Sequence, residues 1–312
     1  MSDFIGTKLT MNLGERSYDI ILKNGALENL YQFARLDRRV AVVTDSGVPA
    51  QYAQRVADQC REARIITVPQ GEASKSFKIL ESVLQQMLDF NMGRGDLVVA
   101  VGGGVVGDLA GFAASIYMRG IDFINCPTTT LSMIDSSIGG KTAVDLGDTK
   151  NIVGAFWQPK LVIVDPDTLA TLPRRHYING LAEAVKASLL ADPELFGIFE
   201  KGDIDGQINE IIYRSLRFKK NIVEQDETER GMRKALNFGH TIGHGIEAVK
   251  GIKGRRTVGL FHGECVALGM LPMIESKALQ KRVRGVYRRL GLPTRTAYDK
   301  EKVLAEMLHD KK

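Results

Sequence analysis

Cysteine is scarce in this chain. Three cysteines occur in 312 residues, at Cys60, Cys126 and Cys265, and no two of them form a CxxC pair. An odd number of widely spaced cysteines excludes both a disulfide framework and a cysteine metal site. We therefore expect a protein of the reducing cytoplasm.

Long apolar runs are absent as well. No run approaches the ~20 residues that a membrane-spanning helix needs. The first residues, MSDFIGTK, lack the basic-then-apolar layout of a signal peptide. The sequence thus predicts an intracellular protein without a membrane partner.

No block of lysine and arginine stands out, although the formal net charge is +5. Hydrophobic residues make up 44% and charged residues 25%, as in an ordinary globular protein. Without a basic block we expect no nucleic-acid partner, and the mild excess of positive charge suits a small anionic substrate. A merely solvated basic surface explains the charge equally well.

The length and the change of pattern along the chain predict two domains sharing one cleft, because 312 residues exceed what one compact core usually holds. Residues 1–172 alternate between strand and helix patterns, typical of an α/β domain with a parallel sheet. Residues 173–312 are almost entirely helical in pattern. We expect strands at 9–13, 17–23, 39–44, 64–68, 96–101, 122–126 and 160–164, and helices at 27–36, 49–63, 77–87 and 109–117.

A glycine-rich turn follows the strand expected at 96–101. Gly102, Gly104 and Gly107 match GxGxxG between a strand and a helix. Glycines let the backbone approach a ligand, and the helix N-terminus offers free N–H groups to a phosphate. The motif is third in the series and lacks the acidic residue about twenty positions on, so it is not the usual dinucleotide fingerprint. We expect a dinucleotide or phosphate loop in a related sheet.

Three other polar positions belong to the same domain. Asp45 ends the strand at 39–44, where it would bind a nucleotide ribose or cap the next helix. Residues 133–145 are rich in polar groups and glycine and include Lys141, which suits an anion-binding loop; a plain solvent loop is the alternative. Lys150 and Asn151 add a charge and a donor soon after.

Three of the five histidines, His240, His244 and His262, fall in one region of the second domain. On a helix His240 and His244 share a face, with Asn237 and Arg233 a turn or two earlier. Neutral imidazole is the commonest zinc ligand, and a catalytic zinc needs about three protein ligands and an open position. Ordinary helix histidines and a turn cap are the alternative.

A carboxylate that could complete this metal site lies upstream. Glu183 and Lys186 are three residues apart on a predicted helix face whose flanks are apolar. Exposed pairs of this kind are usually surface salt bridges, but here we expect both side chains to be partly buried. Glu183 is therefore the candidate third ligand.

Taken together, these motifs resemble the 3-dehydroquinate synthase family of sugar phosphate cyclases from about residue 10 to the last residue. The resemblance is specific because many motifs agree in order and spacing. They are residues 69–75 (PQGEASK), 102–108 (GGGVVGD), 117–120 (YMRG), 135–141 (DSSIGGK), 154–159 (GAFWQP), 179–183 (NGLAE) and 237–244 (NFGHTIGH).

This resemblance implies the fold, the cofactors and the reaction. Members have a Rossmann-like α/β domain that binds NAD and an α-helical domain that holds a divalent metal, usually zinc, with cobalt as the alternative. They convert 3-deoxy-D-arabino-heptulosonate 7-phosphate to 3-dehydroquinate and phosphate, the second step of the shikimate pathway. NAD is reduced and reoxidised within one turnover, and the enzyme is expected to be a homodimer.

The resemblance also assigns residues. It implies a metal bound by Glu183, His240 and His262, with His244 left as a catalytic residue near the substrate phosphate. The remaining phosphate ligands would be Lys141, Asn151, Asn237, Lys312 and, from the second subunit, Arg119. Lys219 and Arg233 would bind the substrate carboxylate, and Asp135 and Lys186 would lie beside the reacting hydroxyls. The residues implied for NAD are Asp45, Glu72, Lys75, Gly103, Gly104, Val105, Asp108, Thr128, Thr129, Lys150, Thr171 and Leu172.

Two departures from the family pattern stand out. The loop before His262 is longer than in typical members, and the chain stops at the Asp-Lys-Lys motif, which the family usually continues past. A terminal Lys312 would be frayed and would carry a negative charge beside it. We therefore expect this chain to bind NAD and metal but to turn over slowly.

Three rival functions remain at this point. A metal-dependent alcohol or glycerol dehydrogenase would not need Lys141, Lys219, Arg233 and Lys312 and would release NADH. Other sugar phosphate cyclases act on substrates without a carboxylate, which Lys219 and Arg233 argue against. A nucleotide-binding regulatory module with a structural metal is the non-enzymatic reading. In that last case His262→Ala would unfold the protein rather than abolish catalysis alone.

Overall fold

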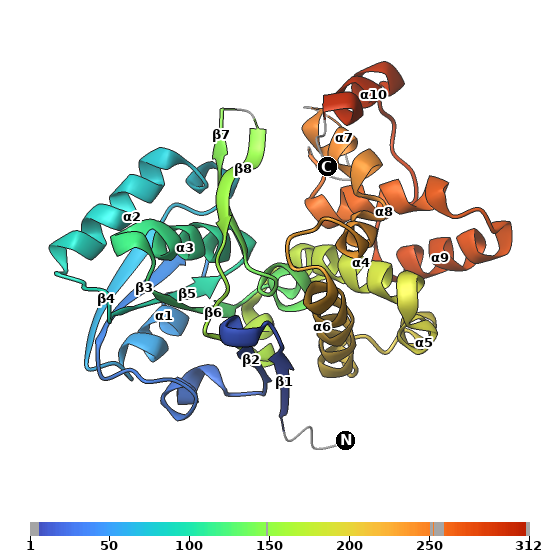
Figure 1. Ribbon diagram of the computed structural model, residues 1–312. Coiled ribbons are helices and arrows are strands. Elements are labelled where there is room, and N and C mark those ends of the chain that lie inside the picture. The colour runs from blue at the N-terminus through green and yellow to red at the C-terminus, as the bar shows by residue number, and fades with distance from the viewer. Residues whose placement is uncertain (1–5, 148, 250–251, 253–258, 310–312) are drawn as a thin grey trace. The chain divides into compact units, whose positions relative to one another are not determined.

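The computed structural model describes residues 6–147, 149–249, 252 and 259–309 (Figure 1). The predictions for Lys312 and for most of the loop before His262 lie outside these residues. The chain divides into two compact units, Met1–Leu172 and Pro173–Lys312. Each unit is described by itself below.

The first unit alternates strands and helices. Its strands are β1 (Thr7–Met11), β2 (Tyr18–Leu22), β3 (Arg39–Asp45), β4 (Glu62–Val68), β5 (Leu97–Gly102), β6 (Asp122–Pro127), β7 (Lys141–Leu146), β8 (Thr149–Phe156) and β9 (Leu161–Val164). Its α-helices are α1 (Ala50–Ala57), α2 (Phe77–Asp89) and α3 (Gly104–Ile116). Short 3₁₀ or π turns are Gly14–Arg16, Leu27–Gln32, Glu72–Ser74, Tyr117–Arg119, Ser132–Ser136 and Pro166–Thr171.

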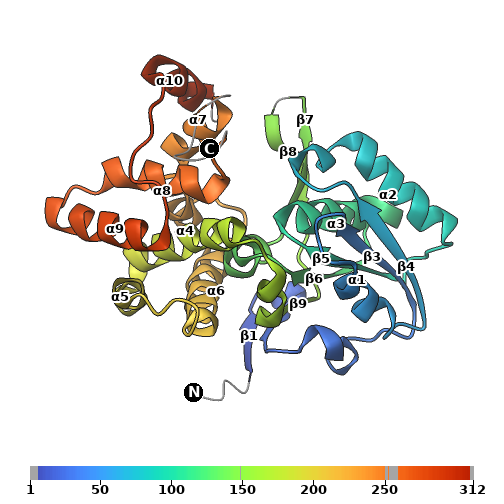
Figure 2. The same cartoon turned by 180° about the vertical axis from the view of Figure 1, so that it is seen from behind.

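One sheet forms the centre of this unit, in the order β1-β2-β9-β6-β5-β3-β4. All neighbours run parallel except β1, which pairs antiparallel with β2. Side chains alternate along β3: Ala41 and Val43 pack under α2 and α3, and Val40 and Val42 pack under α1. Both faces are therefore buried, as the continuous β-branched runs predicted for a parallel sheet. Helices cover both faces in Figures 1 and 2.

The strand order creates a switch point between β3 and β5. From β3 the chain goes to β4 on one side and then returns to β5 on the other side of β3. The connections leave in opposite directions at the carboxyl ends of these two strands. Open α/β sheets bind ligands at this position.

Several predicted boundaries are wrong. The helix expected at 49–63 ends at Ala57, because β4 already begins at Glu62. The helix expected at 27–36 is a shorter 3₁₀ segment with a kink at Asn29. The helix expected at 109–117 begins at Gly104, so its first turn lies within the glycine motif itself.

The polar segment 133–145 is not a plain loop. A π-helical turn, Ser132–Ser136, is followed by the antiparallel pair β7 and β8, which were not predicted. The two strands form a separate hairpin with an irregular register between Val144 and Leu146. Its strands alternate only weakly between apolar and polar residues, so the period-2 signal was hidden.

The second unit is built of helices. They are α4 (Arg174–Ala191), α5 (Pro193–Lys201), α6 (Ile208–Gln225), a 3₁₀ helix Met232–Asn237, α7 (His240–Ala248), α8 (His262–Met273), α9 (Lys277–Leu290) and α10 (Lys300–His309). The apolar helix α8 contacts α4, α7 and α9, so it forms the centre of this unit.

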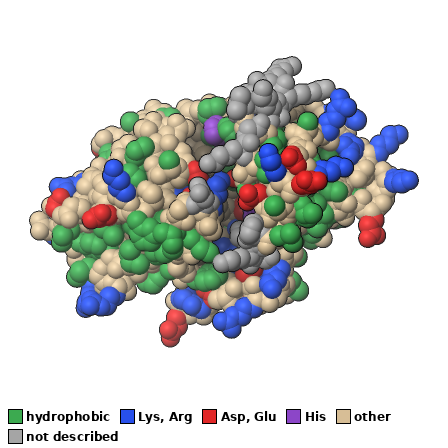
Figure 3. All heavy atoms as spheres, turned by 90° about the horizontal axis from the view of Figure 1, so that it is seen from above, with side chains coloured by type: hydrophobic (Ala, Val, Ile, Leu, Met, Phe, Trp, Pro, Cys, Tyr) green, Lys and Arg blue, Asp and Glu red, His purple; other side chains and the backbone are tan. Residues whose placement is uncertain are grey.

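None of the helices in the described residues is long and apolar enough to cross a membrane. Figure 3 shows Lys, Arg, Asp and Glu side chains interspersed over one face.

Candidate active site

Four side chains from three helices of the second unit converge on one point. Glu183 comes from α4, His240 and His244 from α7, and His262 from α8. Ligand atoms of the three imidazoles lie within 4.8 Å of one another. Glu183 Oε1 is 3.7 Å from Nε2 of His240 and 3.7 Å from Nε2 of His262. The predicted carboxylate and all three predicted histidines are therefore neighbours.

Glu183 is the buried centre of this cluster, with 2% of its surface exposed. Neither of its carboxylate oxygens has a hydrogen bond of good geometry, although the ammonium of Lys186 contacts Oε2 as an ion pair. Burial alone would raise the pKa of Glu183, but Lys186, His240 and His262 hold it well below its usual range. A buried anionic carboxylate facing imidazole nitrogens fits a divalent cation with nitrogen and oxygen ligands.

The two imidazoles nearest Glu183 differ in their electrostatics. Burial lowers the pKa of His240 to about 3, so this ring is neutral. Burial also opposes protonation of His262, but the nearby carboxylates of Glu183 and Glu247 raise its pKa to about 9. In the metal-free protein His262 therefore carries the positive charge of the cluster. A metal would have to displace this proton.

Glycines allow the three helices to approach closely. A Cβ on Gly243 of α7 would lie 3.1 Å from the Cys265 carbonyl of α8, and one on Gly263 of α8 would lie 2.0 Å from the Asn179 carbonyl oxygen of α4. Gly239 has φ +82°, a left-handed conformation that starts α7 after the preceding 3₁₀ helix. The spacing of these glycines sets the distances within the cluster.

Hydrogen bonds from α4 hold the start of α8, which carries His262. Asn179 Oδ1 accepts the N–H of Gly263 at 2.7 Å. Arg175 makes a two-pronged ion pair with Glu264 at 2.8 and 2.9 Å, and Glu264 also accepts the N–H of Phe261. His262 is thus fixed through its backbone from both sides.

Arg233 and Asn237 do not share the helix of His240 and His244, which corrects the prediction of one common helix face. Both lie in the 3₁₀ helix Met232–Asn237, and Gly239 breaks the chain direction before α7. Arg233 is 1% exposed and donates to the Glu227 carbonyl. The Asn237 amide donates to Glu229 at 3.2 Å. Lys219, on the neighbouring helix α6, is also buried.

In the first unit the glycine motif lies at the switch point of the sheet. Gly103 precedes α3 and Gly104 begins it, so Val105 is in the first turn. A Cβ on Gly103 or Gly104 would contact Thr129 at 3.1 Å or Ser136 at 3.0 Å. The free N–H groups of the first turn of α3 are therefore suited to bind a phosphate.

Asp45 lies on the other side of this switch point. Its Oδ1 accepts the N–H groups of Gly47 at 2.7 Å and Val48 at 3.2 Å. The carboxylate thus holds the turn before α1 but does not cap that helix, whose N-cap is Pro49 without a side-chain hydrogen bond, so the predicted capping role is wrong. A second role toward a ribose stays a prediction.

Lys75 is the centre of a polar network in this unit. The side chain is 4% exposed, and its ammonium contacts Asp108 at 2.7 Å, the Asn151 amide oxygen, and Glu72 at 3.9 Å. Burial alone would lower the pKa of Lys75, but Asp108 and Glu72 raise it. The network joins four predicted site residues that come from three separate segments of the sequence.

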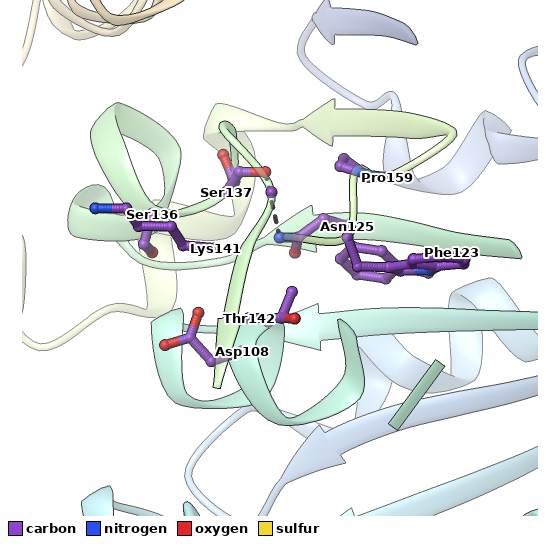
Figure 4. Close-up of a pocket in the computed structure, with 11 residues that line it drawn as sticks. Asp108, Phe123, Asn125, Ser136, Ser137, Lys141, Thr142 and Pro159 are labelled. Carbon is purple, nitrogen blue, oxygen red and sulfur yellow. Dashed lines mark hydrogen bonds between the residues drawn. The ribbon is translucent and has the colours of Figure 1, made fainter. Parts of the chain in front are cut away.

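A small hollow lies between α3, β6 and the β7–β8 hairpin. Figure 4 shows Asp108, Ser136 and Lys141 on the same side of it, and Asn125 donating to the Ser137 carbonyl at 3.4 Å. Asp108 and Lys141 were predicted site residues; Asn125 and Ser136 were not. Asn125 lies within an ordinary apolar strand pattern, so its position at a hollow could not be predicted from the pattern.

The other predicted residues of the first unit lie in different surroundings. Thr128 is buried just after β6, and Thr171 bonds to Tyr52 at 2.9 Å close to Leu172. Asp135 is in the π-helical turn, and Lys150 is exposed on β8. Arg119 has φ +72° in the 3₁₀ turn after α3 and is not among the residues that line the hollow.

Solved structures with this fold define the broad class. A 2-epi-5-epi-valiolone synthase from Streptomyces hygroscopicus subsp. jinggangensis 5008, solved with NAD+ and Zn2+ bound, is 29% identical with a TM-score of 0.85, over 96% of this chain and 87% of that chain. A probable glycerol dehydrogenase from Sinorhizobium meliloti 1021 is 19% identical with a TM-score of 0.65, over 94% and 89%. The chain has the fold shared by sugar phosphate cyclases and these dehydrogenases.

The sequence comparisons identify the family within this class. The 3-dehydroquinate synthase of Streptococcus mutans serotype c is 40% identical, over 98% of this chain and 90% of that protein. The family models described as 3-dehydroquinate synthase N-terminal and C-terminal match residues 65–179 and 180–312. This chain belongs to the 3-dehydroquinate synthase family, as the motifs predicted.

Proposed function

We propose that this chain converts 3-deoxy-D-arabino-heptulosonate 7-phosphate to 3-dehydroquinate and phosphate, using NAD and one divalent metal, with zinc as the first choice. The observation that carries the proposal is the buried Glu183 carboxylate facing His240, His244 and His262. Membership of the family and the glycine motif at the switch point of the sheet support it.

Glu183, His240 and His262 would hold the metal, and His244 would remain beside it. All three imidazoles are close enough to be ligands. We choose the set with Glu183 because a buried carboxylate balances the charge of a dication better than a third neutral ring. His244 would then be available to hydrogen-bond the substrate phosphate.

Bound NAD would take up and return a hydride, and the bound metal would act as a Lewis acid at the substrate hydroxyl. The residues of the chain would bind and orient the substrate. The phosphate would be held by Lys141, Asn151, Asn237, His244 and Lys312, together with Arg119 of a second copy. Lys219 and Arg233 would hold the carboxylate; Arg233 is already fixed by the Glu227 carbonyl, so its guanidinium needs little reordering.

Asp135 and Lys186 would lie beside the reacting hydroxyls. Lys186 is 3% exposed and paired with Glu183, so its ammonium would stay close to the metal ligands. The residues proposed for NAD are those of the first unit around the switch point and those of the Lys75 network other than Asn151. We further propose a cytoplasmic homodimer; three free cysteines are compatible with that compartment.

Phosphate release from 3-deoxy-D-arabino-heptulosonate 7-phosphate with catalytic NAD, before and after chelation of metal, tests this function. We expect release that stops on chelation, returns with Zn²⁺ and leaves no net NADH. Stoichiometric NADH without phosphate would instead identify a dehydrogenase. Lys141→Met should lower kcat/KM by the loss of one charge-assisted phosphate contact, roughly ten-fold or more.

A further inference from the structure

Glu247 shares a helix face with two of the site histidines. It follows His240 by seven residues and His244 by three on α7, so the three side chains point to the same side of the helix. None of the roles proposed above uses it. Its side chain is 19% exposed, which places it at the edge of the cluster rather than in open solvent.

The Glu247 carboxylate contacts the far nitrogen of the His262 ring. Glu247 Oε2 is 3.0 Å from Nδ1 of His262, while Nε2 of the same ring is 3.7 Å from Glu183 Oε1. An ionised carboxylate can only accept a hydrogen bond, so Nδ1 must be the protonated nitrogen. In a neutral ring, Nε2 then carries the lone pair, and this nitrogen faces Glu183.

We propose that Glu247 is a positioning residue, which holds the His262 ring in the Nδ1–H tautomer and directs Nε2 toward Glu183 and His240. The proposal rests on the metal site of the proposed function. Carboxylates that accept from the outer nitrogen of a metal-binding imidazole fix its orientation and increase its basicity as a ligand. Glu247 would therefore raise the affinity for the metal without touching it.

A purely structural role, tying α7 to α8, is the competing explanation. These helices already pack against each other at Gly243 and Cys265, and at Gly239 and Gly269, where an added Cβ would meet backbone atoms. The α8 start is also held by Asn179 and by the Glu264 pair with Arg175. Removing Glu247 should thus free the His262 ring while leaving the helices in place.

The test compares zinc binding and imidazole NMR in four proteins: wild type, Glu247→Ala, Glu247→Gln and Glu306→Gln. The last variant loses the same charge at an exposed position of α10 in the same unit. Zinc affinity is measured against a chromophoric chelator at pH 9.5, where protons compete weakly for the imidazoles. Because the chain has five histidines, long-range ¹⁵N spectra of the zinc-loaded protein at pH 7.5 can be assigned with His262→Gln.

We expect the wild-type spectrum to show His262 with Nδ1 protonated and Nε2 bound to zinc. Glu247→Ala should lose about 10- to 100-fold in zinc affinity, and its His262 signals should broaden or shift. Glu247→Gln, which keeps an acceptor oxygen, should lose less, and Glu306→Gln should match wild type. Circular dichroism of each variant monitors folding.

Two results would overturn the inference alone: zinc affinity and His262 spectra that do not change in Glu247→Ala, or coordination of His262 through Nδ1 in wild type. If Glu247→Ala does not fold, Glu247→Gln decides by the same two readouts. A wild-type protein that binds no zinc at this cluster would overturn the metal site of the proposed function as well.

Discussion

Breaking the ion pair between Glu183 and Lys186 should strongly destabilise the metal-free protein, and the loss should depend on which partner is replaced. Both side chains are almost fully buried, at 2% and 3% exposed. Glu183→Gln leaves the Lys186 ammonium buried without its counter-charge, and loss of one partner of such a pair costs about 3–5 kcal/mol. We expect the lower end, about 3 kcal/mol, because the amide oxygen can still accept a hydrogen bond.

Lys186→Met should cost less than Glu183→Gln. The Glu183 carboxylate then still faces His262, whose pKa is raised to about 9 and which therefore remains protonated at neutral pH. The double variant Glu183→Gln/Lys186→Met removes both charges and should recover most of the stability, because neutral replacements avoid the desolvation of two ions. Its zinc affinity should not recover.

Urea unfolding of the metal-free protein in the presence of chelator, followed by far-ultraviolet circular dichroism, measures these differences. The helical second unit contributes strongly to this signal, whereas the single tryptophan, Trp157, reports on the first unit. A tryptophan transition that moves less than the dichroism transition locates the loss in the second unit. The buried-pair reasoning is wrong if the free energy of unfolding of Glu183→Gln is within about 1 kcal/mol of wild type. It is also wrong if the double variant is the least stable of the three.

Three further predictions concern the histidine cluster and the Lys75 network. In the metal-free protein the pKa of His262 is higher in the folded state than in the unfolded state, where it is ~6.5, so His262 stabilises the fold fully below that pH. The free energy of unfolding should therefore fall as the pH rises toward about 9. Urea midpoints that stay flat over this window, or that fall equally in His262→Gln, would contradict this. Gly263→Ala, whose Cβ would lie 2.0 Å from the Asn179 carbonyl oxygen, should lose about 1–3 kcal/mol and weaken zinc binding. The matched control Gly285→Ala, inside α9 with open space at its Cβ, should gain up to about 1 kcal/mol. Lys75→Met should remove the contacts to Asp108 and Asn151 and weaken NAD binding several-fold in fluorescence titrations. The control Lys78→Met, at an exposed position of α2, should leave NAD binding unchanged.

Much of the first unit could be predicted because its strands are continuous apolar runs separated by glycine turns. The runs at β3 and β5 are buried on both faces, so pattern and environment agree. The β7–β8 hairpin could not be predicted in the same way. Its position is determined by contacts with α3 and by the bond from Asp145 N–H to the Lys75 carbonyl, which connect residues far apart in the sequence.

The histidine cluster could be predicted because the rarity and spacing of its residues can be seen in one short stretch of sequence. The residue that each imidazole ring contacts cannot be seen there, because the partners lie in other segments. Glu247 stands inside the same motif, and its i+7 spacing from His240 was visible, but nothing in that spacing says that it faces His262, fifteen residues later. The same holds for Arg233, which the helical spacing placed on the wrong element because Gly239 turns the chain before α7 begins.

The glycines of 239–245 have a different meaning in the structure from the one that composition suggests. In an isolated helix each glycine would cost up to about 1 kcal/mol relative to alanine. Here Gly243 faces the α8 backbone. A Cβ added at Gly245 would lie 2.9 Å from the Val303 carbonyl oxygen of α10. The cost in helix propensity is offset by close packing, which brings His240, His244 and Glu247 of α7 to His262 of α8. A motif that looks flexible in the sequence thus specifies a fixed geometry, and substituting its glycines should disturb the metal site before it disturbs the helix.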